Sequence, residues 1–262
     1  MNQDNSLFSL DGKVVVVTGG TKRYGLCMAE GLAEAGATVI LTSRDKARAE
    51  EVAHPLRERG LDAHGAQLQQ GDDASIEAFV GGIIAEYGRI DVLVNSARHI
   101  PGMTAFEIDR AELDKTFTVN ATGQILLTRR VIEAMRSTGG GNIINIGSIY
   151  GMGGQDPRVY DDPDRNISFD YAIMKGGMIA WTKQLATVLA KDNIRCNCLS
   201  LGGFKEPTSL PAGLEERYCE RTPMGRMANT NDVKGPIVFL ASNASGYMTG
   251  ANLVVDGGWT AW

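Results

Sequence analysis

The stretch that decides the fold reads Val14-Val15-Val16-Val17-Thr18-Gly19-Gly20-Thr21-Lys22-Arg23-Tyr24-Gly25. Four consecutive β-branched apolar residues predict a short buried strand, and the glycines that follow predict a tight turn. In residues 26–35 the apolar positions recur with helical spacing, so the turn leads into a helix. A strand, a glycine turn and a helix in this order indicate the first unit of a parallel α/β sheet.

The same alternation continues along the chain. Further strands are predicted at residues 38–42, 91–95, 142–146, 194–199 and 252–255. Helices are predicted at residues 45–59, 73–87, 109–136, 169–190 and 232–240. Pro55 predicts a kink or break in the helix at 45–59, because proline removes a backbone hydrogen bond there. The pattern predicts a Rossmann-type doubly wound parallel sheet with helices on both faces.

Length and composition favour one domain over residues 1–262. The chain has 43% hydrophobic residues, enough for a substantial core, and contains no stretch that resembles a linker. The least regular segment, residues 151–168, is rich in Gly, Pro and Asp. It follows a strand end, where ligands bind in open parallel sheets. We interpret it as a candidate lid, with a solvated insertion as an equal alternative.

Charge and residue usage exclude several classes of partner. The chain carries 26 basic and 31 acidic residues without a basic cluster, so we expect a small-molecule substrate and no nucleic acid. A polar start and the lack of a long apolar run predict a cytoplasmic protein without membrane contact. The four cysteines and three histidines lack metal-site spacing, which predicts reduced thiols and no structural metal.

The glycine turn and the end of the second strand indicate a dinucleotide site. Glycines there let backbone amides approach a pyrophosphate, which the helix N-terminus also attracts. The second strand is followed by Ser43-Arg44, with no acid before Asp45. A basic residue at this place accommodates the 2′-phosphate of NADP, since arginine donates a planar pair of hydrogen bonds. Lys22 and Arg23 add charge from the turn. The alternative is that Arg44 is merely a solvated residue at a helix start.

A second motif predicts proton chemistry. Tyr171 and Lys175 lie one helical turn apart, and a neighbouring positive charge favours the ionised phenol, so the tyrosine can give or take a proton. Ser148 follows the strand at 142–146 and brings a hydroxyl to the same edge of the sheet. Alone, a tyrosine and a lysine at this spacing are typical of a helix surface. Their combination with the glycine turn, Ser148 and Asn120 makes the motif specific for proton transfer.

Taken together, these motifs resemble the short-chain dehydrogenase/reductase family over nearly the whole chain. The resemblance also includes Asn95-Ser96-Ala97, Asn197 to Gly202, and Val255-Asp256-Gly257-Gly258. It implies that Tyr171 is the general acid/base, that Ser148 positions the carbonyl, and that Lys175 assists Tyr171 and holds the nicotinamide ribose. It also implies that Asn120 anchors a relay water, and that the protein is a homotetramer with contacts at the two long helices and the last strand. The predicted cofactor contacts are Gly19, Thr21, Lys22, Arg23, Tyr24, Gly25, Ser43, Arg44, Asn95, Ala97, Tyr171, Lys175 and Gly202.

The chain departs from the family pattern at several positions. Arg23 replaces the middle glycine of the turn, which is similar to the turn of the pteridine reductases. Gln69 stands where the family often has an acid beside the adenine, and Leu201 replaces a proline before Gly202. Arg98 replaces the glycine of Asn-Asn-Ala-Gly. None of these departures affects the four residues expected to carry out the proton chemistry, which are Asn120, Ser148, Tyr171 and Lys175.

The only indication of the substrate is the interval from Ser148 to Tyr171, which is longer than is usual in this family. Similar insertions occur in a subgroup that resembles flagellin-glycan and sugar-acid oxidoreductases. We therefore expect a polyhydroxylated or carboxylated substrate, with Arg98 as its carboxylate partner. A position of Arg98 in solvent or at a subunit contact is an equal alternative.

The sequence thus predicts an NADP(H)-dependent oxidoreductase that transfers a hydride between nicotinamide and a carbonyl or alcohol carbon of a polar substrate. A pteridine or 3-oxoacyl reductase is the alternative within the enzymes. A catalytically silent binding subunit of the same fold is the alternative outside them. A nucleotide-sugar epimerase is disfavoured, because only residues 257–262 follow the last predicted strand.

Overall fold

The computed structural model describes residues 7–101, 104, 106–160, 169–205 and 210–262. Within these residues, seven parallel strands form one sheet in the order β3-β2-β1-β4-β5-β6-β7. The strands are β1 (Val14–Val17), β2 (Thr38–Ser43), β3 (Ala63–Gln67), β4 (Val92–Asn95), β5 (Gly141–Ser148), β6 (Ile194–Leu201) and β7 (Asn252–Val255). The strand order changes direction between β1 and β4, which is the switch point of a doubly wound sheet. The predicted Rossmann-type fold is confirmed.

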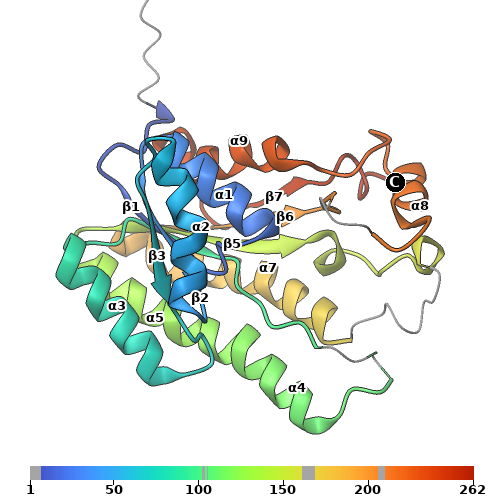
Figure 1. Ribbon diagram of the computed structural model, residues 1–262, viewed down its shortest axis with the longest axis horizontal. Coiled ribbons are helices and arrows are strands. Elements are labelled where there is room, and N and C mark those ends of the chain that lie inside the picture. The colour runs from blue at the N-terminus through green and yellow to red at the C-terminus, as the bar shows by residue number, and fades with distance from the viewer. Residues whose placement is uncertain (1–6, 102–103, 105, 161–168, 206–209) are drawn as a thin grey trace, which may run out of the picture.

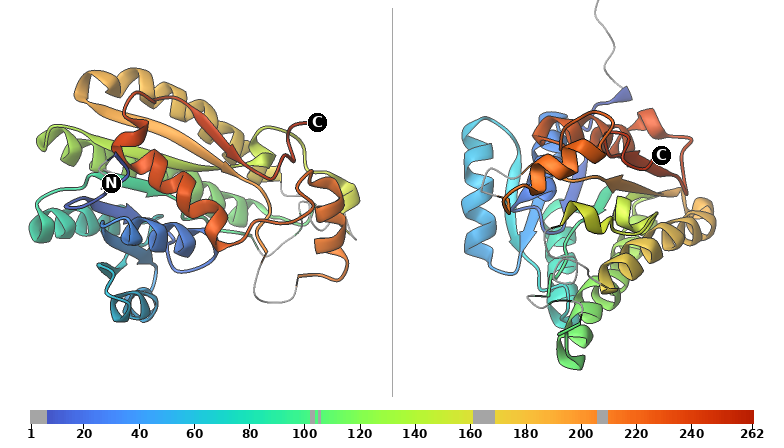
Figure 2. Two further views of the ribbon diagram at one scale, coloured as in Figure 1. Left: turned by 90° about the horizontal axis from the view of Figure 1, so that it is seen from above. Right: turned by 90° about the vertical axis from the view of Figure 1, so that its right-hand side faces the viewer.

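Helices cover both faces of the sheet (Figures 1 and 2). One face carries α1 (Arg23–Glu34), α2 (Lys46–Glu58) and α9 (Thr230–Ala241). The other carries α3 (Asp73–Tyr87), α5 (Gln124–Ser137) and α7 (Phe169–Leu189), with α4 (Arg110–Phe117) leading into α5. A further helix, α8 (Leu214–Arg221), lies near the C-terminus in Figure 1.

The β-branched run of β1 explains why the core has two halves. Val15 and Val17 pack into the cluster with α1, α2 and α9, whereas Val14 and Val16 pack into the cluster with α3, α5 and α7. Successive side chains of a strand point to opposite faces, so a central parallel strand must be apolar at every position. All four valines are buried, and β1 therefore anchors the turn that follows it.

The structure corrects four sequence predictions. The edge strand β3 was missed, because its residues Ala63–Gln67 are weakly apolar and only one of the five is fully buried. The short helix α8 was also missed. The single helix expected at 109–136 consists of α4, a π-helical turn at Thr118–Gly123, and α5. Pro55 does not break α2, which continues to Glu58; Pro55 is exposed, so water can satisfy the carbonyl left without a partner.

The segment expected to be a lid or a solvated insertion is described only in part. Residues 161–168 lie outside the described residues. In the described part, Pro157–Val159 form a short 3₁₀ turn, and Val159 is buried in a cluster with Ile149, Tyr218 and Met227. Arg217 of α8 also donates a hydrogen bond to the carbonyl of Val159 at 2.9 Å. This part of the segment therefore packs against α8 and is not simply solvated.

Candidate active site

A cavity of about 1000 Å³ runs along the carboxyl edge of the sheet. It is lined by the turn after β1, the end of β2, the segment between β3 and α3, the segment after β4, the end of α4 with the π-helical turn, the ends of β5 and β6, and α7. The predicted site residues that line it are Gly19, Thr21, Lys22, Arg23, Tyr24, Gly25, Ser43, Arg44, Ala97, Tyr171 and Lys175. The fold thus brings most of the predicted cofactor contacts and both members of the Tyr/Lys pair into one space.

Close approaches in the turn require glycine. Gly19 has φ +64°, and a Cβ there would lie 2.8 Å from the Cα of Ala97. A Cβ on Gly25 would lie 2.3 Å from the carbonyl oxygen of Gly19. The N-cap of α1, Lys22, makes no side-chain capping bond, and the first turn contains no acid. The first amides of α1 are therefore suited to an anion such as a pyrophosphate.

Arg23 replaces a glycine without losing its conformation. It has φ +52°, which is in the left-handed region that side chains usually avoid. Its side chain is exposed and lines the cavity. The backbone path of the turn is thus kept while a guanidinium is added to it.

Thr18 fixes the turn to the segment after β4. Its hydroxyl oxygen accepts hydrogen bonds from the amides of Ser96 and Ala97, both at 2.9 Å, and it donates to the carbonyl of Val94 at 3.2 Å. Thr18 was not among the predicted site residues. Its position directly after β1 is the signal that identifies it.

The end of β2 is basic on the cavity side. Ser43, Arg44 and Arg48 line the cavity there. The nearby acid, Asp45, caps α2 by accepting a hydrogen bond from the amide of Ala47 at 2.8 Å, and it is not among the lining residues. The group available to a ribose at this end is therefore a cation.

Positive charge prevails along the whole cavity. Among the lining residues that the structure describes, seven are Lys or Arg and one is an acid, Asp72. The basic residues are Lys22, Arg23, Arg44, Arg48, Arg98, Lys115 and Lys175. Low-dielectric walls focus such charge onto a ligand, so the cavity favours anions along its length.

Tyr171 and Lys175 line the cavity from α7. The side chain of Lys175 is buried, and its Nζ donates to the carbonyl of Ile146 at 2.5 Å. Nζ lies 5.8 Å from the centroid of the Tyr171 ring. Burial, followed by the charge of Arg98, lowers the pKa of Lys175 to about 8. An ammonium that is easily deprotonated therefore lies beside the phenol.

Arg98 also lies at this end of the cavity. Its Cζ is 5.0 Å from the centroid of the Tyr171 ring, which is within cation–π range. After burial, the charge of Arg98 is the next cause that lowers the pKa of Arg23. Three cations therefore gather around one phenol.

Four predicted residues do not line the cavity: Asn95, Asn120, Ser148 and Gly202. Asn95 is buried and donates to Thr128 and Asn145. The Ser148 hydroxyl accepts a hydrogen bond from the amide of Tyr150 at 3.2 Å. The Gly202 carbonyl accepts one from the Tyr24 hydroxyl at 3.1 Å.

Asn120 clamps the backbone of His99. Its Oδ1 accepts from the His99 amide at 2.6 Å, and its Nδ2 donates to the His99 carbonyl at 2.9 Å. Nε2 of the His99 ring is hydrogen-bonded to Oε1 of Glu112 in α4 at 2.5 Å. His99 and Glu112 were not among the predicted site residues, because their pairing depends on how α4 packs. The relay water expected at Asn120 stays a prediction.

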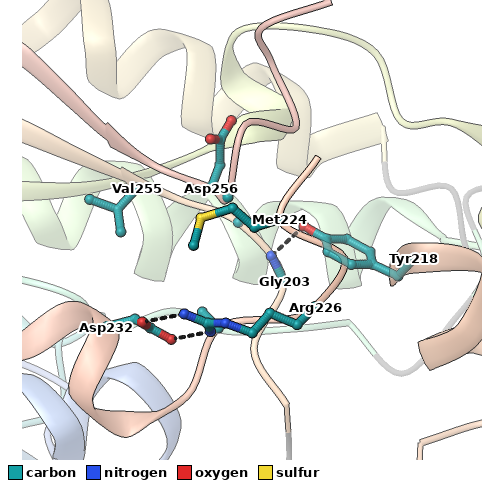
Figure 3. A pocket seen from close by; sticks show the side chains of 10 residues that line it. Gly203, Tyr218, Met224, Arg226, Asp232, Val255 and Asp256 are labelled. Carbon is teal, nitrogen blue, oxygen red and sulfur yellow. Dashed lines mark hydrogen bonds and ion pairs between the residues drawn. The ribbon is translucent and has the colours of Figure 1, made fainter. Parts of the chain in front are cut away.

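A second, smaller pocket of about 100 Å³ lies at the carboxyl ends of β6 and β7 (Figure 3). Of its three charged side chains, Arg226 and Asp232 pair with each other at 2.6 and 2.8 Å, and Asp256 accepts hydrogen bonds from the amides of Gly258 and Thr260, both at 2.8 Å. Its phenol, Tyr218, accepts a hydrogen bond from the amide of Gly203 at 2.5 Å and stacks on Trp259. Since these groups satisfy one another, the pocket supports the chain after β6 and is not our candidate site.

In the described part of the chain, no helix combines the length and the apolar character needed to cross a membrane.

The fold and the cavity define a Rossmann-type oxidoreductase that uses a nicotinamide cofactor. The family model described as "Enoyl-(Acyl carrier protein) reductase" matches residues 24–260, and the chain belongs to the short-chain dehydrogenase/reductase family. Its members act on CH–OH and C=O groups. The resemblance found in the sequence is confirmed.

Relatives of known name cover almost the whole chain. The 3-oxoacyl-[acyl-carrier-protein] reductase FabG of Aquifex aeolicus is 32% identical, over 95% of this chain and 98% of the relative. The 5-keto-D-gluconate 5-reductase of Escherichia coli K12 is also 32% identical, over 97% and 98%. A crystal structure of a gluconate 5-dehydrogenase from Burkholderia cenocepacia in complex with NADP and tartrate has a TM-score of 0.87 at 30% identity, and covers 98% of both chains.

Proposed function

We propose that the protein is an NADP(H)-dependent oxidoreductase acting on the carbonyl or alcohol carbon of a polar substrate, sugar-like or carboxylated. One observation carries this proposal. A single cavity joins the basic end at Lys22 and Arg44 to the buried Lys175 beside Tyr171. A phosphate-binding end and a proton-transfer end within one space are what hydride exchange with a nicotinamide requires.

The bound nicotinamide cofactor supplies or accepts the hydride, and the chain supplies the proton and the orientation. In the reductive direction, Tyr171 donates its hydroxyl proton to the substrate oxygen; in the oxidative direction it takes the proton back. Lys175, held by the carbonyl of Ile146, stabilises the phenolate by its charge. We assign Ser148 to hydrogen bonding of the substrate oxygen and Asn120 to the water that returns the proton.

The preference for NADP(H) over NAD(H) rests on charge at the end of β2. Arg44 lines the cavity, while Asp45 is occupied as the cap of α2. A guanidinium binds a 2′-phosphate through charge-assisted hydrogen bonds, whereas NAD sites use an acid there. The NADP in the Burkholderia structure agrees with this preference. Gly19 and Gly25 allow the tight backbone turn whose amides would face the pyrophosphate.

A pteridine reductase is the second candidate, favoured by Arg23, which lines the cavity from the glycine turn. A 3-oxoacyl reductase is favoured by likeness to the Aquifex relative. The silent-subunit hypothesis is disfavoured by the shared cavity of Tyr171 and Lys175, which drift would not preserve.

We further propose that residues 1–262 act as one cytoplasmic domain, without nucleic-acid or membrane partners, in a homotetramer. The tetramer is supported by large apolar side chains that remain exposed on or next to the helices and the strand expected at subunit contacts. They are Phe106, Phe117, Ile125, Phe169, Ile173, Val188 and Val254. Single exposed apolar residues are common, but a set of this kind on neighbouring elements indicates an interface.

A turnover assay tests the function. The purified protein is incubated with NADPH or NADH and a panel of sugar acids, neutral ketoses, a dihydropteridine and a 3-oxoacyl thioester. We expect turnover of the polar carbonyl compounds with NADPH. Turnover of the pteridine or the thioester alone would replace the proposal by one of its alternatives, and no turnover with either cofactor would support the silent subunit.

A further inference from the structure

The charges of the cavity are not all explained by a dinucleotide. Lys22 and Arg44 lie on exposed loops at the ends of β1 and β2, which is the end that the phosphates of NADP(H) require. Lys175 is held by the carbonyl of Ile146, and Arg23 belongs to the glycine turn. Arg98, at the tyrosine end, has no role in the proposed chemistry.

Arg98 contacts the Tyr171 ring and leaves its donors available. Among the residues that the structure describes, no carboxylate forms an ion pair with Arg98, and its Cζ lies 5.0 Å from the ring centroid. The hydrogen-bond donors of a guanidinium lie in its plane, so contact with a ring face does not occupy them. The guanidinium fork matches the two oxygens of a carboxylate.

The backbone on both sides of Arg98 is fixed. Before it, the amide of Ala97 donates to the Thr18 hydroxyl. After it, His99 is clamped through its backbone by Asn120 and through its ring by Glu112. The side chains of His99 and Glu112 are 15% and 20% exposed, so their pair is shielded from water. An arginine between two such anchors is presented to the cavity from a rigid base.

We propose that Arg98 binds a carboxylate of the substrate beside Tyr171, and that it restricts this cavity to keto acids and hydroxy acids. This inference rests on the proposed function and names its substrate class. Glu112, which does not line the cavity, acts as a positioning residue through His99 and Arg98, whereas His99 also lines the cavity.

The electrostatics of Lys175 support the inference. After burial, the charge of Arg98 is the next cause that lowers the pKa of this lysine. A carboxylate on Arg98 offsets that charge and so favours the ammonium form of Lys175. A substrate with its own negative charge therefore offsets the charge of Arg98, which a neutral substrate does not.

The test uses keto acids paired with their methyl esters, which keep the carbonyl and remove the charge. Suitable acids are 5-keto-D-gluconate, levulinate and acetoacetate. Binding of each acid and ester is measured by calorimetry, with the protein alone and saturated with NADP⁺, and kcat/KM is measured with NADPH. The variants are Arg98→Gln, Arg98→Lys and, as a control, Arg48→Gln, which removes a cation from the other end of the same cavity.

We expect the wild-type protein to favour at least one acid over its ester by about 10- to 100-fold, as for a hydrogen bond to a charged group. Arg98→Gln brings this ratio close to one, Arg98→Lys keeps part of it, and Arg48→Gln leaves it unchanged. A wild type that binds no acid, or treats acid and ester alike, overturns the proposal, as does a preference that survives Arg98→Gln. NADPH binding is measured separately, so failure of the cofactor proposal is recognised independently.

Discussion

The two ends of the cavity use positive charge in different ways. At the phosphate end, Lys22 and Arg44 are exposed; Lys22 is the N-cap of α1 and Arg44 directly follows β2. At the tyrosine end, Lys175 is buried, is held by the carbonyl of Ile146, and has its pKa lowered to about 8, first by burial. Exposed charges act on a ligand through screened attraction, whereas a buried charge depends on the few atoms around it. In the proposed function, the first end selects the cofactor and the second controls the proton.

The largest effect is expected at the tyrosine end. Tyr171→Phe removes the transferable proton and keeps the ring on which Arg98 lies. We expect kcat to fall by about 10² to 10⁴-fold, the usual contribution of a general acid, while the Kd for NADPH changes little. Steady-state kinetics and a fluorescence titration check this. Near-normal turnover would exclude Tyr171 as the acid, and loss of NADPH binding would give the ring a cofactor role instead.

At the phosphate end, Arg44→Asp is expected to change cofactor choice and leave the chemistry intact. Replacing the guanidinium by a carboxylate removes charge-assisted hydrogen bonds to the 2′-phosphate and adds repulsion. We expect the Kd for NADPH to rise by about 10- to 100-fold relative to that for NADH. Equal changes for both cofactors would place the 2′-phosphate elsewhere, with Lys22 and Arg23 as the next residues to test.

A smaller effect on substrate preference is expected from changing Glu112 of α4, which pairs with His99 next to Arg98. Glu112→Ala frees the ring of His99, so Arg98 is less well positioned. We expect the preference for keto acids over their esters to fall by about threefold to tenfold, without a change in NADPH binding. Glu112→Gln keeps a hydrogen-bond acceptor for His99 and should restore most of the preference. An unchanged ratio in Glu112→Ala would remove Glu112 and His99 from the positioning of Arg98.

The smallest effect is a shift in pH dependence. Because the folded-state pKa of Lys175 is lowered to about 8, its ammonium is present below that pH and is lost as the pH rises through it. Arg98→Gln removes a positive neighbour and so raises this pKa. The alkaline decline of kcat/KM, measured with a neutral carbonyl substrate, should move to higher pH. A shift to lower pH, or an equal shift in Arg48→Gln, would contradict a local effect of Arg98.

The same contrast explains what could be predicted from the sequence. The strand and turn at the phosphate end could be predicted because a short run encodes them, with four valines for β1 and glycines where a Cβ would clash; phosphate binding there stays a proposal. Tyr171 and Lys175 were predicted because one helical turn joins them. The contact of Lys175 with the carbonyl of Ile146, 29 residues away, depends on the register of β5 against α7, which no local pattern encodes.

Other misses have the same physical origin. The edge strand β3 has weak apolar periodicity, because only one neighbouring strand pairs with it. The π-helical turn at Thr118–Gly123 was missed because its sequence has the apolar spacing of an ordinary helix. Only the hydrogen-bond pattern of the backbone distinguishes the two kinds of helix. The pairing of His99 with Glu112 arises from the packing of α4. The sequence therefore predicted which residues the site contains better than how they are held.

The most direct test of the account is a titration of the wild-type protein with NADPH and, in parallel, with NADH, followed by nicotinamide fluorescence. The account predicts a Kd for NADPH at least about tenfold below that for NADH, equivalent to roughly 1.4 kcal/mol. Equal affinities, tighter binding of NADH, or no binding of either cofactor would contradict it.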